Sequence, residues 1–335
     1  MQAAIYGLSG PVLTEDERHF FSDSDAAGYI LFRRNCIDPK QVEALTESLR
    51  GLSGRADLPI LIDQEGGRVA RMRPPHWPEF PPGWAFAALY EKAPSSAIEA
   101  ARANSRALAL MLRSAGVNVD CLPLLDVRQP EADEIIGDRA LGHDPMQVAA
   151  LGRAILDGLR SGGVVGVIKH IPGHGRATCD SHKDLPVVEA SQDELATDLE
   201  PFESLSWAPM GMTAHVVYTA WDPKLPASQS PTVVRDIIRG RIGFDGLLMS
   251  DDIGMEALKG GFGERAAGVI AAGCDVVLHC SGEMDEMVAV ARAVPEMSAK
   301  GESRLKRAME TIAAAVDGPG LKESIAKRDE LLALA

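Results

Sequence analysis

The chain is short of positive charge and has no long apolar run, and each shortage excludes a class of protein. Its 34 Lys and Arg residues stand against 48 Asp and Glu residues, which gives a formal net charge of -14. This charge argues against nucleic acids and anionic membrane surfaces as partners. No stretch of about 18 consecutive apolar residues is present, so we expect no transmembrane helix.

Cysteine is also scarce, and its pattern indicates a reducing compartment. Five cysteines, an odd number, stand at positions 36, 121, 179, 274 and 280, and no two of them form a Cys-x-x-Cys pair. Several lie in apolar runs, which predicts reduced, small core residues in a cytoplasmic protein. The start, MQAAIYGLSG, lacks a basic segment followed by a long apolar segment, so we also expect no signal peptide.

The sequence shows no sign of a second domain. It has no Gly/Ser-rich linker, no block of like charge and no low-complexity segment. The first apolar run contains G-x-S-G rather than G-x-G-x-x-G, so the dinucleotide-binding fingerprint is absent and we expect no cofactor. We therefore predict one catalytic domain over residues 1–335, with a charged helical tail from about residue 284. We expect a monomer.

Eight apolar runs alternate with helical patterns along the chain. The runs cover residues 3–10, 27–32, 58–63, 117–127, 164–168, 211–218, 246–252 and 274–280. Alternation of strands and helices is typical of a parallel sheet. Eight such units favour a closed (β/α)8 TIM-type barrel over a doubly wound open sheet, which is the alternative.

Capping patterns mark where the intervening helices begin. The pattern Ser/Thr-x-x-Glu, in which two side chains cap a helix start reciprocally, occurs at Thr14, Ser96 and Ser191. An N-terminal cap followed by proline in the first helical turn occurs at Asp38, Asp144 and Ser230. These signals predict helices after most of the apolar runs.

The segment from Lys169 to Asp184, KHIPGHGRATCDSHKD, holds the densest group of titratable side chains. It follows a short β-branched run, and loops after strand ends form the sites of α/β folds. Histidine titrates near neutral pH, so three histidines here favour proton transfer over a merely solvated turn. A metal site is the other functional alternative, with His170, His174, His182 and Asp180 as possible ligands.

Charged side chains also follow the other predicted strands. They are Asp63, Glu65 and Arg68 after the third run, Asp120 and Asp126 in the fourth, His215 in the sixth, and Asp251 and Asp252 in the seventh. In a barrel these strand ends meet at one mouth. Carboxylates with a proton donor and no cofactor motif suggest hydrolysis of a small polar substrate, and a sugar fits well.

Four of these segments carry a family resemblance. The runs Ile62-Asp-Gln-Glu-Gly-Gly-Arg-Val69, Lys169-His-Ile-Pro-Gly-His-Gly175, Asp180-Ser-His182 and Ser250-Asp-Asp-Ile-Gly-Met255 resemble signature blocks of glycoside hydrolase family 3. Within that family they are similar to the single-domain, cytoplasmic β-N-acetylglucosaminidases of bacterial peptidoglycan recycling. Ile171 stands where the family usually has phenylalanine, and this exchange of one apolar residue for another changes little.

The resemblance implies which residues perform the chemistry. The nucleophile would be Asp251, and the acid/base would be His182 with Asp180 orienting it. This arrangement departs from the usual pair of carboxylates. It is physically sensible, because a histidine near neutral pKa can protonate the leaving oxygen and later activate water.

The resemblance also implies a set of sugar contacts. Those that we expect are Asp63, Arg68, Arg139, Lys169 and His170. Residues expected to support the wall of the site are Glu65, His174, Asp120, Asp126 and Asp252. No metal is expected.

The resulting expectation is a retaining exo-glycosidase that acts on a small-molecule saccharide. It would remove terminal β-linked N-acetylglucosamine from muropeptides that carry anhydro-N-acetylmuramic acid. The alternatives are a family 3 β-glucosidase, a metal-dependent barrel hydrolase using His170, His174 and His182, and a non-catalytic sugar-binding barrel. The metal alternative is weakened because the first apolar run contains no histidine.

Overall fold

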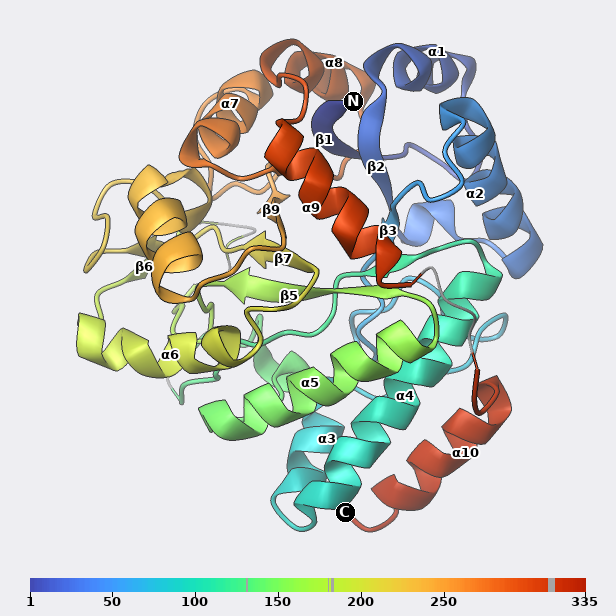
Figure 1. Cartoon of the computed structure of the whole chain (residues 1–335), viewed down its shortest axis with the longest axis vertical. Helices are drawn as coiled ribbons and strands as arrows, with labels where there is room; N and C mark the ends of the chain where they lie inside the picture. Colours follow the sequence, from blue (N-terminus) through green and yellow to red (C-terminus); the bar gives the residue numbers. More distant parts are fainter. Residues whose placement is uncertain (131, 180, 182–183, 313–316) are drawn as a thin grey trace.

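A closed parallel barrel forms the centre of the molecule (Figure 1). The computed structural model describes residues 1–130, 132–179, 181, 184–312 and 317–335. Among these residues, eight strands close in the order β1-β10-β9-β7-β5-β4-β3-β2. They are β1 (Gln2–Gly7), β2 (Ala26–Leu31), β3 (Ile60–Ile62), β4 (Val119–Asp120), β5 (Val165–Ile171), β7 (Met210–Thr213), β9 (Leu247–Asp252) and β10 (Val276–His279). The predicted (β/α)8 barrel is confirmed.

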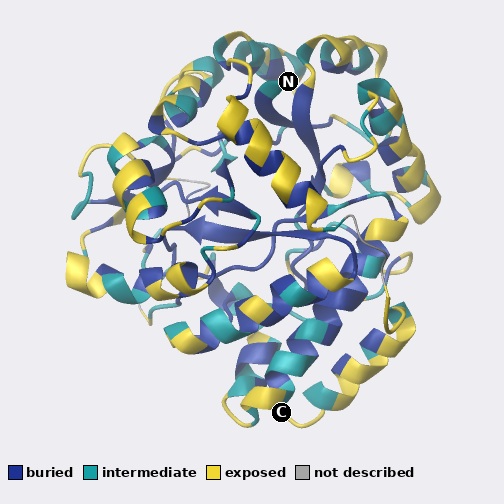
Figure 2. Cartoon of the chain, in the orientation of Figure 1, coloured by how far each residue is buried: buried dark blue, intermediate teal, exposed yellow. Residues whose placement is uncertain are grey.

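The strands are buried on both faces, which explains why they read as continuous apolar runs rather than as alternating patterns. Every residue of β2, β3, β5 and β10 is buried. Figure 2 shows the dark strands enclosed by helices whose outer faces are exposed. Strand β1 pairs in parallel with both β2 and β10, and this double pairing closes the barrel.

Most of the predicted caps open helices of the outer layer. Reciprocal capping starts α1 (Glu15–Ser24) at Thr14 and α6 (Gln192–Ser204) at Ser191. Aspartate caps followed by proline start α2 (Pro39–Ser53) and α5 (Pro145–Ser161). The cap predicted at Ser96 was wrong by three residues, because α4 (Pro94–Ser114) begins at Pro94 with Ala93 in the cap position.

The remaining elements are short or irregular. They are α3 (Gly83–Tyr90), α7 (Phe262–Ala272), the 3-10 turns η1 (Arg33–Asn35), η2 (Gly137–Arg139) and η3 (Ala227–Gln229), and the π-helical η4 (Val233–Arg241). The Ser230 signal is confirmed, since its hydroxyl accepts a hydrogen bond from the N–H of Val233.

Two predicted strands were too long. In residues 117–127, regular pairing covers only β4, because the N–H of Leu122 turns back to the carbonyl of Asp120. In residues 211–218, the chain leaves the barrel after β7. It then forms β8 (Val217–Tyr218), which pairs outside the barrel with β6 (Val187–Val188).

Three helices make up the C-terminal region. Helix α8 (Met284–Ala293) packs against both α7 and α1, and α10 (Leu321–Leu332) packs against α4. Helix α9 (Ala299–Glu310) packs against β9, where Arg304 contacts Asp245 and Asp275, the residues that precede β9 and β10. Helix α9 therefore lies at the end of the barrel where the strands begin.

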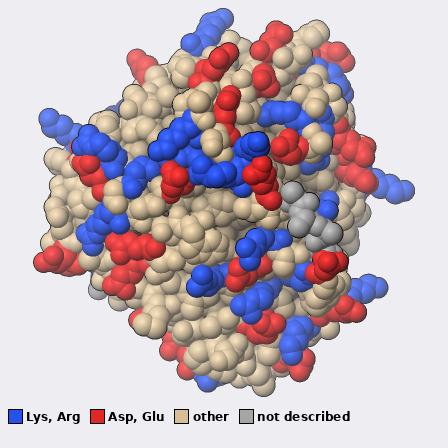
Figure 3. All heavy atoms as spheres, in the orientation of Figure 1, with Lys and Arg blue, Asp and Glu red and all other residues tan. Residues whose placement is uncertain are grey.

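Basic side chains gather over α9 on the face shown in Figure 3. There Lys300, Arg304 and Arg307 form ion pairs with the single carboxylate of Asp245. This basic region is therefore partly neutralised by its own neighbours. Within the described part of the chain, no helix combines the length and the apolar character that crossing a membrane would require.

Candidate active site

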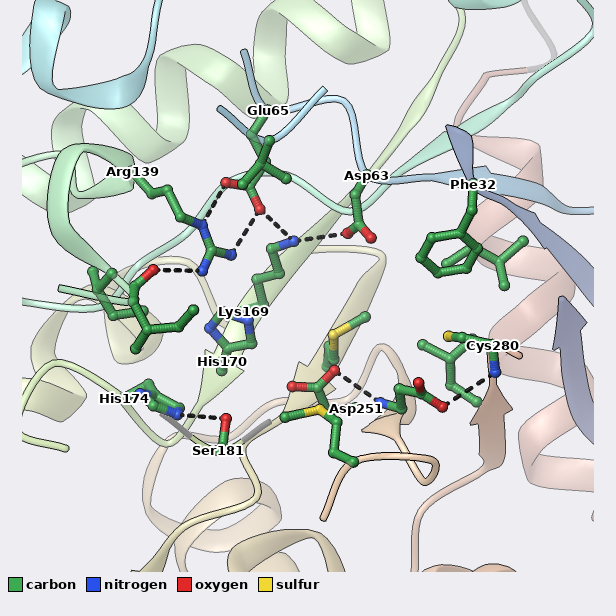
Figure 4. Close-up of a pocket in the computed structure, with 18 of the residues that line it drawn as sticks. Phe32, Asp63, Glu65, Arg139, Lys169, His170, His174, Ser181, Asp251 and Cys280 are labelled. Carbon is green, nitrogen blue, oxygen red and sulfur yellow. Dashed lines mark hydrogen bonds and ion pairs between the residues drawn. The ribbon is translucent and has the colours of Figure 1, made fainter. Parts of the chain in front are cut away.

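A cavity of about 240 Å³ opens where the barrel strands end. Among the predicted site residues, its walls contain Asp63, Glu65, Arg68, Arg139, Lys169, His170, His174, Asp251 and Asp252. These side chains come from the ends of β3, β5 and β9 and from the loops that follow strands, and Figure 4 shows most of them pointing into a common space. The fold therefore brings together residues that are separated by up to about half of the chain.

Lys169, on β5, is the centre of a network of alternating charges. Its Nζ lies 3.0 Å from Asp63 Oδ1 and 2.8 Å from Glu65 Oε1, and the residue is only 2% exposed. Arg139 binds both oxygens of Glu65 at 2.8 Å, and Arg71 binds Asp63 Oδ2 at 2.9 Å. Bidentate pairing of this kind fixes orientation as well as charge.

The network keeps its carboxylates ionised. Burial by itself would raise the pKa of Asp63 and of Glu65. The neighbouring cations outweigh burial, so that the pKa of Asp63 falls well below its usual range and that of Glu65 falls to about 2. For Lys169, burial would lower the pKa, but Asp63 and Glu65 together raise it. The ionised carboxylates of Asp63 and Glu65 can accept hydrogen bonds from sugar hydroxyls. Glu65 cannot deliver a proton near neutral pH.

Replacing Lys169 with methionine is expected to destabilise the fold by about 3 kcal/mol at pH 7, because two buried carboxylates lose a shared cation. Wild-type Asp63 and Glu65 contribute stability above their unfolded pKa values of about 4, and this contribution is lost as the pH falls through the lower folded values. In the variant, burial is opposed only by Arg71 and Arg139, so both pKa values rise above their wild-type values and the deficit should shrink as the pH falls toward 4.

Urea unfolding at several pH values measures this effect. Lys40, an exposed residue on α2, provides the matched control. Lys40→Met should change stability by less than about 0.5 kcal/mol at every pH. A deficit of Lys169→Met that stays constant between pH 7 and 4 would contradict the electrostatic explanation.

Asp251 is presented to the cavity by the end of β9. Its Oδ1 accepts a hydrogen bond of 2.8 Å from the N–H of Asp252. Burial would raise the pKa of the Asp251 carboxyl, but His170, His215 and the Asp252 N–H lower it on balance. An ionised carboxylate on a rigid strand end is suited to attack an electrophilic carbon.

Asp252 has a different environment from its neighbour. Its Oδ1 accepts hydrogen bonds from the N–H groups of Gly254 at 2.9 Å and Cys280 at 3.1 Å. Its carboxylate therefore ties β9 to the end of β10. Burial and the adjacent Asp251 charge raise the pKa of Asp252. These bonds fit the supporting role predicted for Asp252.

Asp126 orients the histidine of β5. Its Oδ2 lies 2.8 Å from His170 Nδ1, and its Oδ1 accepts the backbone N–H groups of His170 at 3.2 Å and His174 at 2.7 Å. Burial would raise the pKa of Asp126, but the two histidines lower it to about 2. An ionised Asp126 accepts a hydrogen bond from the Nδ1–H of His170, which leaves Nε2 as the other hydrogen-bonding atom of the ring.

Burial favours the neutral forms of two other members of the predicted site, Asp120 and His174. Burial raises the pKa of Asp120 well above its usual value and favours its neutral form, although its Oδ1 accepts the N–H of Gln64 at 3.0 Å. Burial and His170 lower the pKa of His174 to about 4, so this ring is neutral at pH 7. His174 Nε2 lies 3.3 Å from Ser181 Oγ.

Arg68 lies at the rim of the cavity, and its side chain is 44% exposed. Its Nε donates to Asp138 Oδ1 at 2.7 Å, and its Nη2 donates to the carbonyl oxygens of Glu134 and Ile135. These bonds brace the loop after β4 over the cavity. A direct sugar contact by Arg68 remains a prediction.

Sequence reasoning missed several residues of the cavity. Arg71 lies two residues beyond the run of residues 62–69 that contains Asp63 and Glu65, and this proximity was the available signal. The apolar part of the wall, which includes Phe32, Met212, Met255 and Cys280, comes from four different strand ends. Single apolar residues of this kind have no pattern that distinguishes them from the core.

Asp180 and His182, the predicted acid/base pair, lie outside the described residues. Ser181, between them in sequence, lines the cavity and is buried. Within the described ranges, no three His, Cys, Asp or Glu side chains converge as a metal centre requires. The metal alternative counted His182 among its ligands, so its full ligand set also extends beyond those ranges.

Comparisons with known proteins agree with this geometry. Residues 5–315 match the glycosyl hydrolase family 3 N terminal domain. The chain is similar to a β-hexosaminidase of Stenotrophomonas maltophilia, with 38% identity over 285 residues and 84% of each chain covered.

Solved structures give the same result. The structure of NagZ from Neisseria gonorrhoeae in complex with N-trifluoroacetyl-D-glucosamine aligns with a TM-score of 0.87 and 33% identity, over 99% of this chain and 98% of that one. A family 3 β-N-acetylglucosaminidase from Paenibacillus aligns with a TM-score of 0.85 and 29% identity, over 98% of this chain. This chain spans 66% of the length of the Paenibacillus protein. The chain belongs to glycoside hydrolase family 3, and it is a glycoside hydrolase of the β-N-acetylhexosaminidase type.

Proposed function

We propose that the protein is a retaining exo-glycosidase that removes terminal β-linked N-acetylglucosamine through a covalent glycosyl-Asp251 intermediate. The observation that carries this proposal is the ionised Asp251 at the end of β9, which shares a small cavity with the Lys169 network. A carboxylate nucleophile and fixed hydrogen-bonding groups within one cavity are what such a reaction needs.

The proposed reaction has two displacements. One Asp251 carboxylate oxygen attacks C1 of the sugar, and the bond from C1 to the leaving oxygen breaks as that oxygen takes a proton from His182. Water then gives a proton back to His182 and attacks C1, which breaks the bond to Asp251 and frees the carboxylate. Two inversions at C1 give overall retention of configuration.

The surrounding residues would hold the sugar while this happens. Asp63 can accept hydrogen bonds from sugar hydroxyls, Lys169 can donate to them, and His170 offers Nε2 as a further hydrogen-bonding atom. The pairing of Asp63 and Lys169 with each other orients both before a ligand arrives. The cavity of about 240 Å³ is smaller than the roughly 300–1,000 Å³ of pockets for drug-sized ligands, which fits one sugar residue at a chain end.

The N-acetyl specificity rests on the relatives. Those with curated names are β-hexosaminidases, and one structure holds an N-acylated glucosamine. The likeness of the signature runs to enzymes of peptidoglycan recycling supports muropeptides with anhydro-N-acetylmuramic acid as the natural substrates and the cytoplasm as the location. The proposal assigns the whole reaction to a single barrel domain acting as a monomer.

Turnover of two aryl glycosides tests the proposal. We expect kcat/KM on nitrophenyl β-N-acetylglucosaminide to exceed that on nitrophenyl β-glucoside by at least about 100-fold, since a site that hydrogen-bonds an amide strongly rejects a substrate without one. Equal values would favour the β-glucosidase alternative. Absence of turnover on both would favour a sugar-binding protein, and loss of activity after dialysis against a chelator would favour the metal-dependent alternative.

A further inference from the structure

His215 is a buried histidine that the proposed reaction does not use. It follows β7 at the point where the chain leaves the barrel, and no part of it is exposed. Its Nε2 lies 3.0 Å from the backbone carbonyl oxygen of Asp252, and its Nδ1 lies 2.7 Å from Ser228 Oγ. The ring therefore connects a segment after β7 directly to the residue that follows the nucleophile.

The hydrogen bonds determine where the ring carries its proton. A carbonyl oxygen can only accept, so Nε2 must donate to Asp252. Burial lowers the pKa of His215 and keeps the ring neutral. In a neutral ring with a proton on Nε2, Nδ1 is an acceptor, and it receives the hydroxyl proton of Ser228. Both ring nitrogens are thus satisfied in one orientation.

Three groups of Asp252, its N–H, its carboxylate and its carbonyl, all form hydrogen bonds. Its N–H donates to Asp251 Oδ1, its carboxylate accepts from Gly254 and Cys280, and its carbonyl accepts from His215 and from the N–H of Met255. The bond from Asp252 N–H sets the direction of the Asp251 carboxylate. The backbone of Asp252 must stay in place for that bond to persist.

We propose that His215 is a positioning residue for the nucleophile: by clamping the Asp252 carbonyl, it keeps the Asp251 carboxylate aimed into the cavity. This inference rests on the proposed function, in which Asp251 attacks the sugar. His215 itself touches no reacting atom, and it does not line the cavity. Its removal should therefore slow the attack without weakening the binding of sugar.

Two substitutions at this position separate positioning from simple loss of structure. His215→Leu keeps much of the side-chain volume but cannot donate to the Asp252 carbonyl. We expect kcat on nitrophenyl β-N-acetylglucosaminide to fall about 100-fold, since a misplacement of about 1 Å can cost this much. The Kd of free N-acetylglucosamine should stay unchanged. His215→Gln supplies an amide N–H near the position of Nε2 and should recover most of kcat.

Thr46→Val provides the matched control for the loss of one buried hydrogen bond. Thr46 is fully buried on α2, away from the cavity, and its hydroxyl lies 2.9 Å from the carbonyl oxygen of Glu43 and 3.0 Å from that of Ala115. Its thermal stability should fall as that of His215→Leu does, while kcat stays at the wild-type value. If His215→Leu does not fold, Ser228→Ala replaces it, because this variant keeps the imidazole but removes its orienting partner. It should lower kcat with Kd unchanged.

A slow fluorinated N-acetylglucosaminide should label Asp251. The rate of this labelling separates the positioning role of His215 from the nucleophilic role of Asp251. The inference predicts labelling of Asp251 in the wild type and slower labelling in His215→Leu. It is overturned if both label equally fast, if Gln restores nothing in a folded protein, or if Kd rises as much as kcat falls. Absence of the label on wild-type Asp251 would instead refute the proposed function.

Discussion

Replacing Asp251 with alanine is expected to lower kcat by about 10⁴- to 10⁶-fold, the range seen when a covalent nucleophile is removed. In the proposed reaction this carboxylate forms the bond to C1, so its loss removes the attacking group itself. Asp252, the adjacent carboxylate, is bound to the N–H groups of Gly254 and Cys280. The variant should fold normally, because Asp251 has its hydrogen bond only to the neighbouring backbone within the described structure.

Kinetics on nitrophenyl β-N-acetylglucosaminide and circular dichroism measure the two parts of this result. Azide should restore turnover of Asp251→Ala and give a glycosyl azide of inverted configuration, since a small anion can attack C1 from the vacated position. Asp252→Asn is the matched control, because it retains one acceptor oxygen, and it should keep far more activity. Labelling of Asp252 rather than Asp251 by a fluorinated glycoside would reverse the assignment.

The second large effect is expected from His182→Ala, because the structure makes two other candidate proton donors in the cavity, Glu65 and His174, unsuitable. Glu65 is held ionised between Arg139 and Lys169, with its pKa lowered to about 2. His174 has its pKa lowered to about 4 and is neutral. Between pH 5 and 8 neither group therefore carries a proton that it can release to a leaving oxygen.

The size of the His182→Ala effect should depend on the leaving group. A nitrophenolate departs with little protonation, whereas a sugar alkoxide requires a proton. Cleavage of a natural disaccharide should therefore slow by about 10²–10⁴-fold, the usual worth of general acid catalysis, and cleavage of the nitrophenyl glycoside far less. Asp180→Asn should show the same order more mildly.

His174→Asn is the control for this experiment. It removes a histidine from the same loop but no transferable proton, so it should slow both substrates by a similar factor. If His182→Ala slows both substrates equally, or leaves the disaccharide untouched, His182 is not the acid.

The barrel could be predicted because burial on both faces makes each strand a continuous apolar run. The errors arose where only part of an apolar run belongs to a barrel strand and the rest is buried elsewhere. In residues 117–127, the regular ladder ends at Asp120, although the chain continues beside β5. In residues 211–218, the apolar residues of β8 are buried outside the barrel instead of within it. An apolar pattern indicates that residues are buried, but it does not indicate which sheet they join.

The sequence allowed us to predict which of the described residues lie near the cavity, but not which of them contact each other. Strand ends of a barrel converge, so Asp63, Lys169 and Asp251 were expected to meet. That Glu65 lies between Lys169 and Arg139 depends on the path of the loop after β4, which no local pattern specifies. The contribution of His215 was equally hidden, because a histidine in an apolar run gives no indication of its partners.

The position of the cavity also determines the order of events in a catalytic cycle. Buried side chains of Ile30, Met212 and Leu278 close its inner end, and α9 packs at the opposite end of the barrel. Substrate and both products must therefore pass through the same mouth. In the proposed exo reaction, the cleaved remainder of the saccharide lies nearer that mouth and leaves first, and the monosaccharide behind it leaves last. Free monosaccharide thus competes with substrate for the empty enzyme, which links the speed of the cycle to how quickly the cell consumes that sugar.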